Sequence, residues 1–483
     1  MTSSSNFSVA NVPLKFGTDG WRDIIGDKFT ADNVARAAQA YANYLHEHNE
    51  TDVLVGFDTR FNGQFFAERT AQVLAANGLK VQLSPSFLPT PMLSFATKHQ
   101  GAAGAVMLTA SHNPPPYLGF KLKGSYGGTA TSDIYDAVSH GANAIGGSAV
   151  KAFDSRHHTI GVLEAQTAYF DALGALVDVT ALKNASGAVA HDAMGGAGCG
   201  VMAALWAHFG LKLDLRPLRN TPDPMFYGVN PEPLPQNLQS TRDYMAGAGQ
   251  DALFASVTDG DADRLGVVLP GGGFFNSHQI FAVLLDMLSR KGLTGKVVKT
   301  VTTSRIVERL ARARGLEVVE VPVGFKHIVS AMLEGDVLIG GEESGGIGVT
   351  GHIPERDGFA NTLLLLEYVI QSGKGLAEIF ADIERETDWQ HAYDRLDLHL
   401  KGNELKDAVL ASLESPPTTI ANRTVESVER IDGVKLNLSD NAWLLFRASG
   451  TEPVLRVYCE APSHAEVQQI LSAAHDFVEQ HGV

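Results

Sequence analysis

Three aspartates at alternate positions follow an apolar stretch that we expect to form a strand. Asp259, Asp261 and Asp263 can converge on one divalent cation and leave coordination positions open to substrate oxygens or water. An EF-hand loop starts with the same spacing but needs a glycine at its sixth position and a glutamate at its twelfth. Arg264 and Pro270 stand at these positions here, so the motif is not an EF-hand. A solvated acidic turn is disfavoured because neighbouring carboxylates repel one another without a cation. The motif therefore predicts a Mg²⁺ site with an arginine beside it that attracts an anion.

A serine stands in a tight turn directly after the expected strand Ala102–Leu108. Open α/β sheets bind ligands at the carboxyl ends of their strands, which is where Thr109–Pro114 places Ser111. An ordinary Ser/Asn turn remains the alternative, whereas a hydrolase elbow is disfavoured because no G-x-S-x-G surrounds the serine. His112 could polarise the serine, although adjacent side chains point apart in an extended chain. Lys121, ten residues further on, can return toward the serine as a proton-transfer group.

A third group of residues has the composition of a phosphate site. Arg447 ends an expected strand, small residues follow it, and Arg456 comes shortly after. The small residues are Ser449, Gly450 and Thr451. A forked guanidinium, hydroxyl donors and free backbone N–H groups together form a cradle for a phosphate monoester. A surface turn with two solvated arginines is the alternative.

Glycine-rich loops occur at three further places, and only one of them is a candidate site. Adjacent carboxylates in Gly340–Gly346, which includes Glu342, follow the apolar stretch Val337–Ile339 and could accept hydrogen bonds from sugar hydroxyls. The segment Gly195–Gly200 lacks the G-x-G-x-x-G spacing of a dinucleotide site. The segment Gly292–Lys296 is too short for a P-loop and has no Ser or Thr after its lysine.

The elements that carry these motifs alternate between helix and strand patterns. This alternation predicts an α/β fold with mixed, mainly parallel sheets. The pattern restarts twice and then changes, which predicts three similar α/β domains and a smaller C-terminal α+β domain. The predicted boundaries are 1–155, 156–257, 258–380 and 381–483.

Composition limits the partners that this chain of 483 residues can have. The formal net charge is −16, so the chain as a whole does not attract nucleic acid or anionic lipid. Cys199 and Cys459 lie far apart and form no disulfide framework. The N-terminal segment lacks the pattern of a signal peptide, and no apolar stretch is long enough to cross a bilayer. We therefore expect a soluble cytoplasmic protein.

Taken together and in this order, the motifs resemble those of the α-D-phosphohexomutase family. The matching segments are Phe16–Arg22, Thr109–Pro114, Asp259–Arg264, Gly341–Gly345 and Arg447–Thr451. The resemblance covers the whole chain and implies that four domains surround a central cleft. It also implies that a bisphosphosugar intermediate turns over in that cleft, so that both ends of the sugar meet the same serine.

The resemblance further implies roles for individual residues. Ser111 would carry a phosphoryl group, and one Mg²⁺ per chain would be held by Asp259, Asp261, Asp263 and an oxygen of that phosphoserine. The other catalytic residues would be Lys121, which shuttles the hydroxyl proton, Arg22 and Arg264, which stabilise the transferring phosphoryl, and His112. The substrate-binding residues would be Glu342, Ser344, Lys326, His352, Arg356, Arg447, Ser449, Gly450, Thr451 and Arg456.

The same resemblance indicates a substrate. The loops Gly341–Ser344 and Val323–Lys326 are similar to those of glucose-specific members, so we expect interconversion of glucose 1-phosphate and glucose 6-phosphate, with glucose 1,6-bisphosphate as intermediate and activator. A glucose-1,6-bisphosphate synthase would have the same catalytic residues. Mannose or glucosamine phosphates are further alternatives, and a non-catalytic sugar-phosphate binder is a remote one. We expect a monomer or a homodimer.

Overall fold

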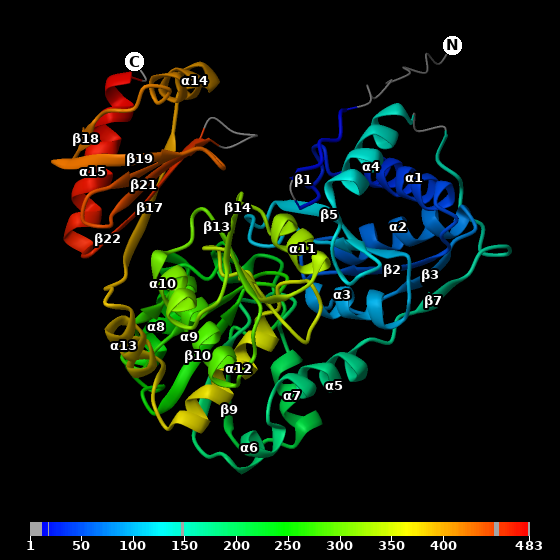
Figure 1. Cartoon of the computed structure of the whole chain (residues 1–483). Helices are drawn as coiled ribbons and strands as arrows, with labels where there is room; N and C mark the ends of the chain where they lie inside the picture. The colour runs from blue at the N-terminus through cyan, green and yellow to red at the C-terminus, as the bar shows by residue number, and fades with distance from the viewer. Residues whose placement is uncertain (1–11, 18, 146–148, 449–453, 482–483) are drawn as a thin grey trace.

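The computed structural model describes residues 12–17, 19–145, 149–448 and 454–481, and it contains four β-sheets that follow one another along the chain. The predicted order of three α/β units and one α+β unit is confirmed. In Figure 1 the first unit, in blue and cyan, and the last unit, in orange and red, lie on opposite sides of the view, above the green and yellow middle units.

The first sheet has seven strands, in the order β1-β5-β4-β2-β3-β7 with β6 paired to β5. Strands β2, β3, β4 and β7 are parallel, and β1, β5 and β6 are antiparallel to their neighbours. The strands are β1 (Trp21–Ile24), β2 (Asp52–Phe57), β3 (Lys80–Leu83), β4 (Gly104–Leu108), β5 (Tyr117–Gly124), β6 (Gly128–Thr129) and β7 (Ile160–Val162). The helices are α1 (Ala31–Glu47), α2 (Gly63–Ala76), α3 (Thr90–His99) and α4 (Ser132–Ala144).

The second sheet has the order β12-β11-β10-β8-β9, in which β8, β9 and β10 are parallel. Its strands are β8 (Ala188–Asp192), β9 (Asp214–Leu218), β10 (Ala252–Thr258), β11 (Leu265–Val268) and β12 (Phe274–Phe275). Its helices are α5 (Gln166–Leu176), α6 (Val179–Asn184), α7 (Val201–Phe209) and α8 (Gln239–Ala246).

The third sheet has the order β14-β13-β15-β16, with β16 antiparallel to the rest. Its strands are β13 (Lys296–Thr300), β14 (Val318–Val321), β15 (Val337–Gly341) and β16 (Ile347–Val349). The helices are α9 (Ser277–Arg290), α10 (Arg305–Ala313), α11 (Phe325–Glu334), α12 (Gly358–Ser372) and α13 (Leu376–Thr387).

The fourth sheet is antiparallel throughout and has the order β17-β22-β21-β20-β19-β18. Its strands are β17 (Ala392–His399), β18 (Thr419–Ile420), β19 (Arg423–Glu429), β20 (Val434–Leu438), β21 (Trp443–Ala448) and β22 (Val454–Ala461). Helices α14 (Asn403–Ser412) and α15 (His464–His481) complete the unit.

Short strands at the sheet edges lie beyond two of the predicted domain boundaries. Strand β7 pairs with β3 of the first sheet although it lies after residue 155. Strands β11 and β12 continue the second sheet beyond residue 257. We propose instead that the first unit ends after Val162 and the second after Phe275.

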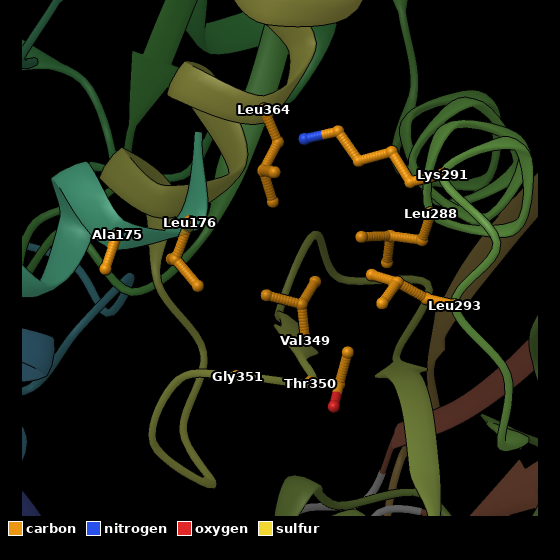
Figure 2. Close-up of a pocket in the computed structure, with 9 residues that line it drawn as sticks. All are labelled: Ala175, Leu176, Leu288, Lys291, Leu293, Val349, Thr350, Gly351 and Leu364. Carbon is orange, nitrogen blue, oxygen red and sulfur yellow. The ribbon is translucent and has the colours of Figure 1, made fainter. Parts of the chain in front are cut away.

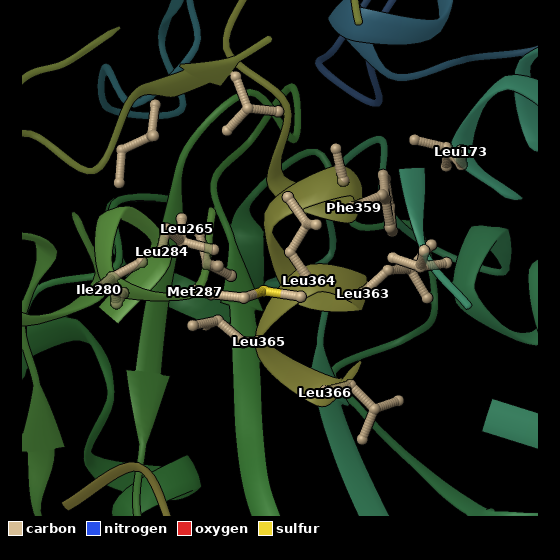
Figure 3. Packing of buried hydrophobic residues seen from close by; sticks show 14 of the residues in the cluster. Leu173, Leu265, Ile280, Leu284, Met287, Phe359, Leu363, Leu364, Leu365 and Leu366 are labelled. Atoms are coloured by element: carbon tan, nitrogen blue, oxygen red, sulfur yellow. The ribbon is translucent and has the colours of Figure 1, made fainter. Parts of the chain in front are cut away.

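The first three units share one apolar core. Helix α12 is apolar around most of its circumference, and Leu363, Leu364, Leu365 and Leu366 are all buried. Figure 3 shows these leucines among Leu265 of β11 and Met287 of α9. The C-terminal unit has an apolar cluster of its own, and a smaller cluster joins it to the third unit, where Val301 packs with Trp443 and Tyr458.

A separate pocket of about 220 Å³ lies where α5, α9 and α12 approach the end of β16. Its lining is mainly aliphatic, with Lys291 reaching across one side, as Figure 2 shows. The lining residues are Ala175, Leu176, Leu288, Lys291, Leu293, Val349, Thr350, Gly351 and Leu364. The lining includes no residue of the predicted site. Among the described residues, no helix is both long enough and apolar enough to cross a membrane.

Candidate active site

Ser111 lies in a strained, buried turn at the carboxyl end of β4. Its backbone φ is 51°, a left-handed conformation that is uncommon outside glycine, and its amide donates to Thr109 Oγ1 at 2.8 Å. The Ser111 hydroxyl donates to Asp259 Oδ2 at 2.9 Å. Strained backbone of this kind concentrates at functional sites. The turn therefore presents the serine oxygen to the aspartate loop of the second unit.

A buried arginine that the sequence analysis did not single out holds this turn in place. The Arg60 guanidinium donates to the carbonyl oxygens of Ser111 and Asn113, each at 2.6 Å. It also pairs with Asp58 at 3.2 Å, and Asp58 accepts a hydrogen bond from Thr109 Oγ1. Burial raises the pKa of Asp58 to about 6, although Arg60 opposes that shift. Arg60 follows β2, which is the parallel neighbour of β4, so both strands end at the same edge of the sheet. This position after a strand is the sequence signal that could have identified Arg60 as a neighbour of the serine turn.

The three aspartates lie together in the loop that joins β10 to β11. Their side chains are buried, and one carboxylate oxygen of each lies within 4.8 Å of the others. Within the described chain, Asp261 Oδ1 and Asp263 Oδ1 are buried without a hydrogen-bond partner. Buried acceptors are normally satisfied, and hard divalent cations prefer oxygen ligands. The residues present therefore fit a bound cation such as Mg²⁺.

Backbone amides and a threonine fix the shape of this loop. Asp259 Oδ1 accepts from the amides of Asp263 and Arg264 at 3.0 and 3.1 Å. Thr90 Oγ1 donates to Asp261 Oδ2 at 2.7 Å, which ties the loop to α3 of the first unit. Burial and the two neighbouring carboxylates hold the pKa of Asp259 well above its ordinary value. The concentration of negative charge is thus unfavourable without a cation.

Lys121 reaches this loop from β5, the antiparallel neighbour of β4. Its ammonium lies 2.9 Å from Asp261 Oδ2, 3.0 Å from Asp19 Oδ2 and 3.6 Å from Asp263 Oδ2. Burial lowers the pKa of Lys121, but the surrounding carboxylates outweigh burial and leave that pKa above its ordinary value. The antiparallel return of the chain brings Lys121 to the same aspartate loop whose Asp259 accepts a hydrogen bond from Ser111, and the role of Lys121 in proton transfer stays a prediction.

Asp19 is a second residue whose role the sequence analysis missed, although it lies inside the quoted segment Phe16–Arg22. Its carboxylate contacts Lys121 at 3.0 Å, Arg22 at 3.0 Å and Arg356 at 3.2 Å. Burial alone would raise the pKa of Asp19, but these three cations hold it well below its ordinary value. Asp19 therefore orients cationic groups that come from the first and third units.

The two predicted phosphoryl-binding arginines contact residues next to the serine turn or bonded to it. Arg22 Nη1 donates to Asn113 Oδ1 at 2.7 Å. Arg264 Nη1 donates to Glu232 at 3.3 Å, and its Nε lies 4.0 Å from Asp259. Both side chains therefore approach residues around Ser111, and their role in stabilising the transferring phosphoryl stays a prediction.

His112 is closer to the serine than the sequence suggested. Its Nδ1 lies 3.4 Å from Ser111 Oγ. The prediction that the two side chains point apart is wrong, because Ser111 has a left-handed rather than an extended backbone. Burial together with Arg264 and Arg22 holds the pKa of His112 well below its ordinary value, so the imidazole is neutral.

The loop between β15 and β16 lies against the aspartate loop. The amide of Leu265 donates to the carbonyl of Gly345 at 3.0 Å. Arg356 joins the two loops, because its guanidinium contacts Asp263 at 2.7 Å and Glu342 at 3.6 Å. Ser344 Oγ is buried and has no hydrogen-bond partner among the residues that the structure describes, so it is available to a ligand.

Lys326 and His352, both predicted to bind substrate, have different surroundings. Lys326 Nζ donates to Ser132 Oγ at 3.1 Å, which joins α11 to α4. The His352 ring pairs with Asp357 at 2.8 Å and stacks on Phe95. Asp357 caps α12 and Phe95 belongs to α3, so both ring contacts join His352 to structural elements, and its role in substrate binding stays a prediction.

The predicted phosphate-binding residues of the C-terminal unit are described only in part. Arg447 lies near the end of β21 and its Nε donates to Asp432 Oδ2 at 2.9 Å. Arg456 lies opposite it on β22 and approaches Asp397 at 3.9 Å. Ser449, Gly450 and Thr451 lie outside the described residues.

The environment of Glu342 predicts a pH dependence of stability. Burial raises the pKa of Glu342 to about 7, although Arg356 opposes that shift, whereas a glutamate in an unfolded chain titrates near about 4.3. Between these values the folded chain binds more protons than the unfolded chain, so Glu342 makes the fold less stable as pH rises. Glu342→Gln removes this effect.

We expect the free energy of unfolding of Glu342→Gln to exceed that of the wild type by a gap that grows as pH rises from about 5 to about 8. The gap should change by up to about 3 kcal/mol over this range, and the melting temperature of the variant should rise accordingly. Scanning calorimetry of both proteins without ligand measures the gap, and the exposed Glu334→Gln is the control. A gap that stays constant with pH would contradict the effect assigned to Glu342.

The arrangement as a whole suits phosphoryl transfer. A hydroxyl nucleophile, a cation site and several cationic side chains meet where the first, second and third units touch. Enzymes of phosphoryl transfer stabilise the spread-out negative charge of the transferring group mainly by positioned cations.

Comparison with known proteins gives a consistent match along the chain. Four family models match, described as phosphoglucomutase/phosphomannomutase α/β/α domains I, II and III and C-terminal domain. They cover residues 13–146, 167–272, 276–386 and 405–476, respectively, which is more than half of the chain.

Individual relatives match this chain over almost their full length, but their names give different substrates. A phosphoglucomutase/phosphomannomutase of Thermococcus kodakarensis is 29% identical, with 96% of this chain and 98% of the relative covered. A phosphoglucosamine mutase of Thermobifida fusca is 28% identical, with 96% and 97% covered. A solved structure from Thermus thermophilus, provisionally described as a phosphomannomutase, is 42% identical, with 97% and 100% covered and a TM-score of 0.87.

Proposed function

Because the chain belongs to the phosphoglucomutase/phosphomannomutase family, whose members are isomerases that act on phosphosugars, we propose that it interconverts glucose 1-phosphate and glucose 6-phosphate. The observation that carries this proposal is the 2.9 Å hydrogen bond from the Ser111 hydroxyl to Asp259, in a loop whose buried carboxylates fit a divalent cation. We further propose that the protein works in the cytoplasm as a monomer or homodimer.

In this proposal Ser111 carries the phosphoryl group between the two sugar positions. Asp259, Asp261 and Asp263 hold Mg²⁺, which neutralises phosphoryl oxygens when it is bound. Arg22, which contacts Asn113, and Arg264, which approaches Asp259, stabilise the charge of the transferring group.

Protons move between the sugar hydroxyls and residues of the first unit. Lys121 shuttles the hydroxyl proton: as the neutral amine it accepts the proton during attack on the phosphoserine, and as the ammonium it returns the proton in the reverse step. Its own proton must first leave, against the carboxylates that raise its pKa. Asp19 keeps Lys121 oriented at 3.0 Å. His112 is neutral and lies beside Ser111 Oγ, where it can take part in the same hydrogen-bond network.

Binding groups on the third and fourth units hold the rest of the sugar phosphate. Glu342 and Ser344 contact sugar hydroxyls, and Arg356 and Lys326 line the same side. Arg447 and Arg456, together with Ser449, Gly450 and Thr451, bind the phosphate that is not reacting. Glucose 1,6-bisphosphate then turns over between the two half-reactions, so that either phosphate can meet Ser111.

Glucose is proposed as the substrate from the loops Gly341–Ser344 and Val323–Lys326. The relatives named above include mutases for mannose and glucosamine phosphates. The direct experiment assays glucose 1-phosphate, mannose 1-phosphate and glucosamine 1-phosphate, each with and without added glucose 1,6-bisphosphate. We expect the highest kcat/KM with glucose 1-phosphate and activation by the bisphosphate; a higher kcat/KM for either other sugar would replace glucose as the substrate.

A bisphosphate synthase is the second candidate, since it would use the same catalytic residues. A mutase must retain its bisphosphate, because each escape leaves Ser111 without a phosphoryl group. We expect little free glucose 1,6-bisphosphate when glucose 6-phosphate and fructose 1,6-bisphosphate are supplied together and products are followed by phosphorus NMR. Its stoichiometric build-up, faster than interconversion of the monophosphates, would favour the synthase.

A further inference from the structure

We propose that Asp432 is a positioning residue that joins the phosphate-binding arginine of the C-terminal unit to the loop in front of α11. The inference rests on the proposed function and concerns how Arg447 is held. Asp432 Oδ2 accepts one hydrogen bond from Arg447 Nε at 2.9 Å and another from the backbone amide of Val323 at 3.0 Å. A single carboxylate oxygen thus connects the fourth unit to the third.

The turn that carries Asp432 is built to lie against the backbone of β21. It joins β19 to β20, and Gly433 there has a φ of 92°, a conformation that favours glycine. A Cβ atom at Gly433 would lie 2.3 Å from the carbonyl oxygen of Phe446, the residue before Arg447. This close approach places the Asp432 carboxylate beside the Arg447 guanidinium.

The contact continues into the predicted sugar-binding loop. The amide of Gly324, next to Val323, donates to Glu342 Oε1 at 3.1 Å. Adjacent amides in front of α11 are therefore held by two carboxylates, Asp432 from the fourth unit and Glu342 from the third. Through Arg356, Glu342 in turn lies next to Asp263. Asp432 thereby fixes Arg447 relative to the groups that would contact the sugar and the cation.

Two opposing effects of Asp432 on phosphate binding have to be weighed. Its negative charge lies near the phosphate and repels it. Against this, the hydrogen bond from Arg447 Nε to Asp432 fixes the plane of the guanidinium before the ligand arrives. Phosphate binding then costs less side-chain conformational entropy than it would with a free arginine. The repulsion is reduced because Asp432 accepts two N–H hydrogen bonds and its side chain is one-quarter exposed to screening solvent. Positioning is therefore expected to dominate.

The test combines single and double variants with a matched control. Asp432→Asn keeps the size of the side chain and removes its charge, and Asp432→Ala removes both hydrogen bonds. Each is made alone and together with Arg447→Ala. Asp440→Asn is the control, because Asp440 is an exposed acid of the same unit that pairs with Arg423. Melting temperatures of all variants show whether the fold is retained.

Steady-state kinetics with glucose 1-phosphate should give a KM about tenfold higher for Asp432→Asn, with kcat changed much less. The control should leave both constants unchanged. Because Asp432 acts through Arg447, its substitution should add little once Arg447 is alanine. An unchanged or lowered KM in Asp432→Asn, or effects that add fully in the double variant, would overturn the proposal.

Direct binding separates this inference from the proposed function. The same set of variants is made in a Ser111→Ala background, and calorimetry measures the Kd for glucose 6-phosphate without turnover. Weaker binding in the Asp432→Asn variant supports the positioning role even if the wild type proves to act on another sugar phosphate. An equal Kd in variant and parent would overturn it whatever the activity of the wild type.

Discussion

Ser111→Ala should lower kcat for glucose 1-phosphate by several orders of magnitude and leave the protein folded. The Oγ atom is the only group at this position that can carry the phosphoryl, and neither His112 nor Asp259 can replace it in the same geometry. The structural effect is small in comparison, because the substitution removes the hydrogen bond to Asp259, worth about 1 kcal/mol, and the longer contact with His112. A coupled assay of glucose 6-phosphate formation measures the loss, and calorimetry checks the fold.

Covalent phosphate provides the second readout for the same variant. Intact-mass analysis of the wild type should find one phosphoryl group on part of the population, and the alanine variant should have none. Ser86→Ala, at an exposed serine of the same unit, is the control and should keep both activity and phosphate. Turnover close to the wild-type rate in Ser111→Ala would show that the carrier is elsewhere.

The part of the site that could be predicted from sequence consists of residues that act within one short loop. Ser111 and the aspartates at positions 259, 261 and 263 carry a signal because their spacing alone brings them together after a strand. Such patterns depend only on local geometry, and the structure places these residues together at the boundary between units.

Residues that act across units could not be found in this way. Asp432 is a single charged residue with no distinctive spacing around it, and Asp19, although it lies in a matching segment, has no local pattern that assigns its partners. Each becomes informative only through partners from distant segments: Asp19 meets Arg356, and Asp432 meets Val323. Nothing in the local sequence specifies those pairings, because they depend on how separate sheets pack.

His352 and the domain boundaries show where a local pattern leaves the arrangement in space open. His352 stands near Arg356 in sequence, yet its ring is directed to Asp357 and Phe95 while Arg356 reaches Asp263. Strands β7 and β11 are only three and four residues long. Segments this short show no clear alternation of apolar and polar residues, so the sequence does not tell which sheet they join. Pairing with β3 and β10 decides their place.

Asp261→Asn should weaken Mg²⁺ binding by at least about tenfold and lower activity in proportion at limiting metal. The substitution keeps the side-chain shape and the contact with Thr90, but it removes one of three anionic ligands and the charge that Lys121 faces. Calorimetric titration of the apoprotein with Mg²⁺ measures the affinity. Asp476→Asn is the matched control, because the exposed group His475, Asp476 and Glu479 also brings potential ligand atoms together but lies on the surface of α15.

For the wild type, EDTA should abolish activity and added Mg²⁺ should restore it. Full activity in chelator, with no metal retained by elemental analysis, would mean that the buried aspartates serve the reaction without a cation.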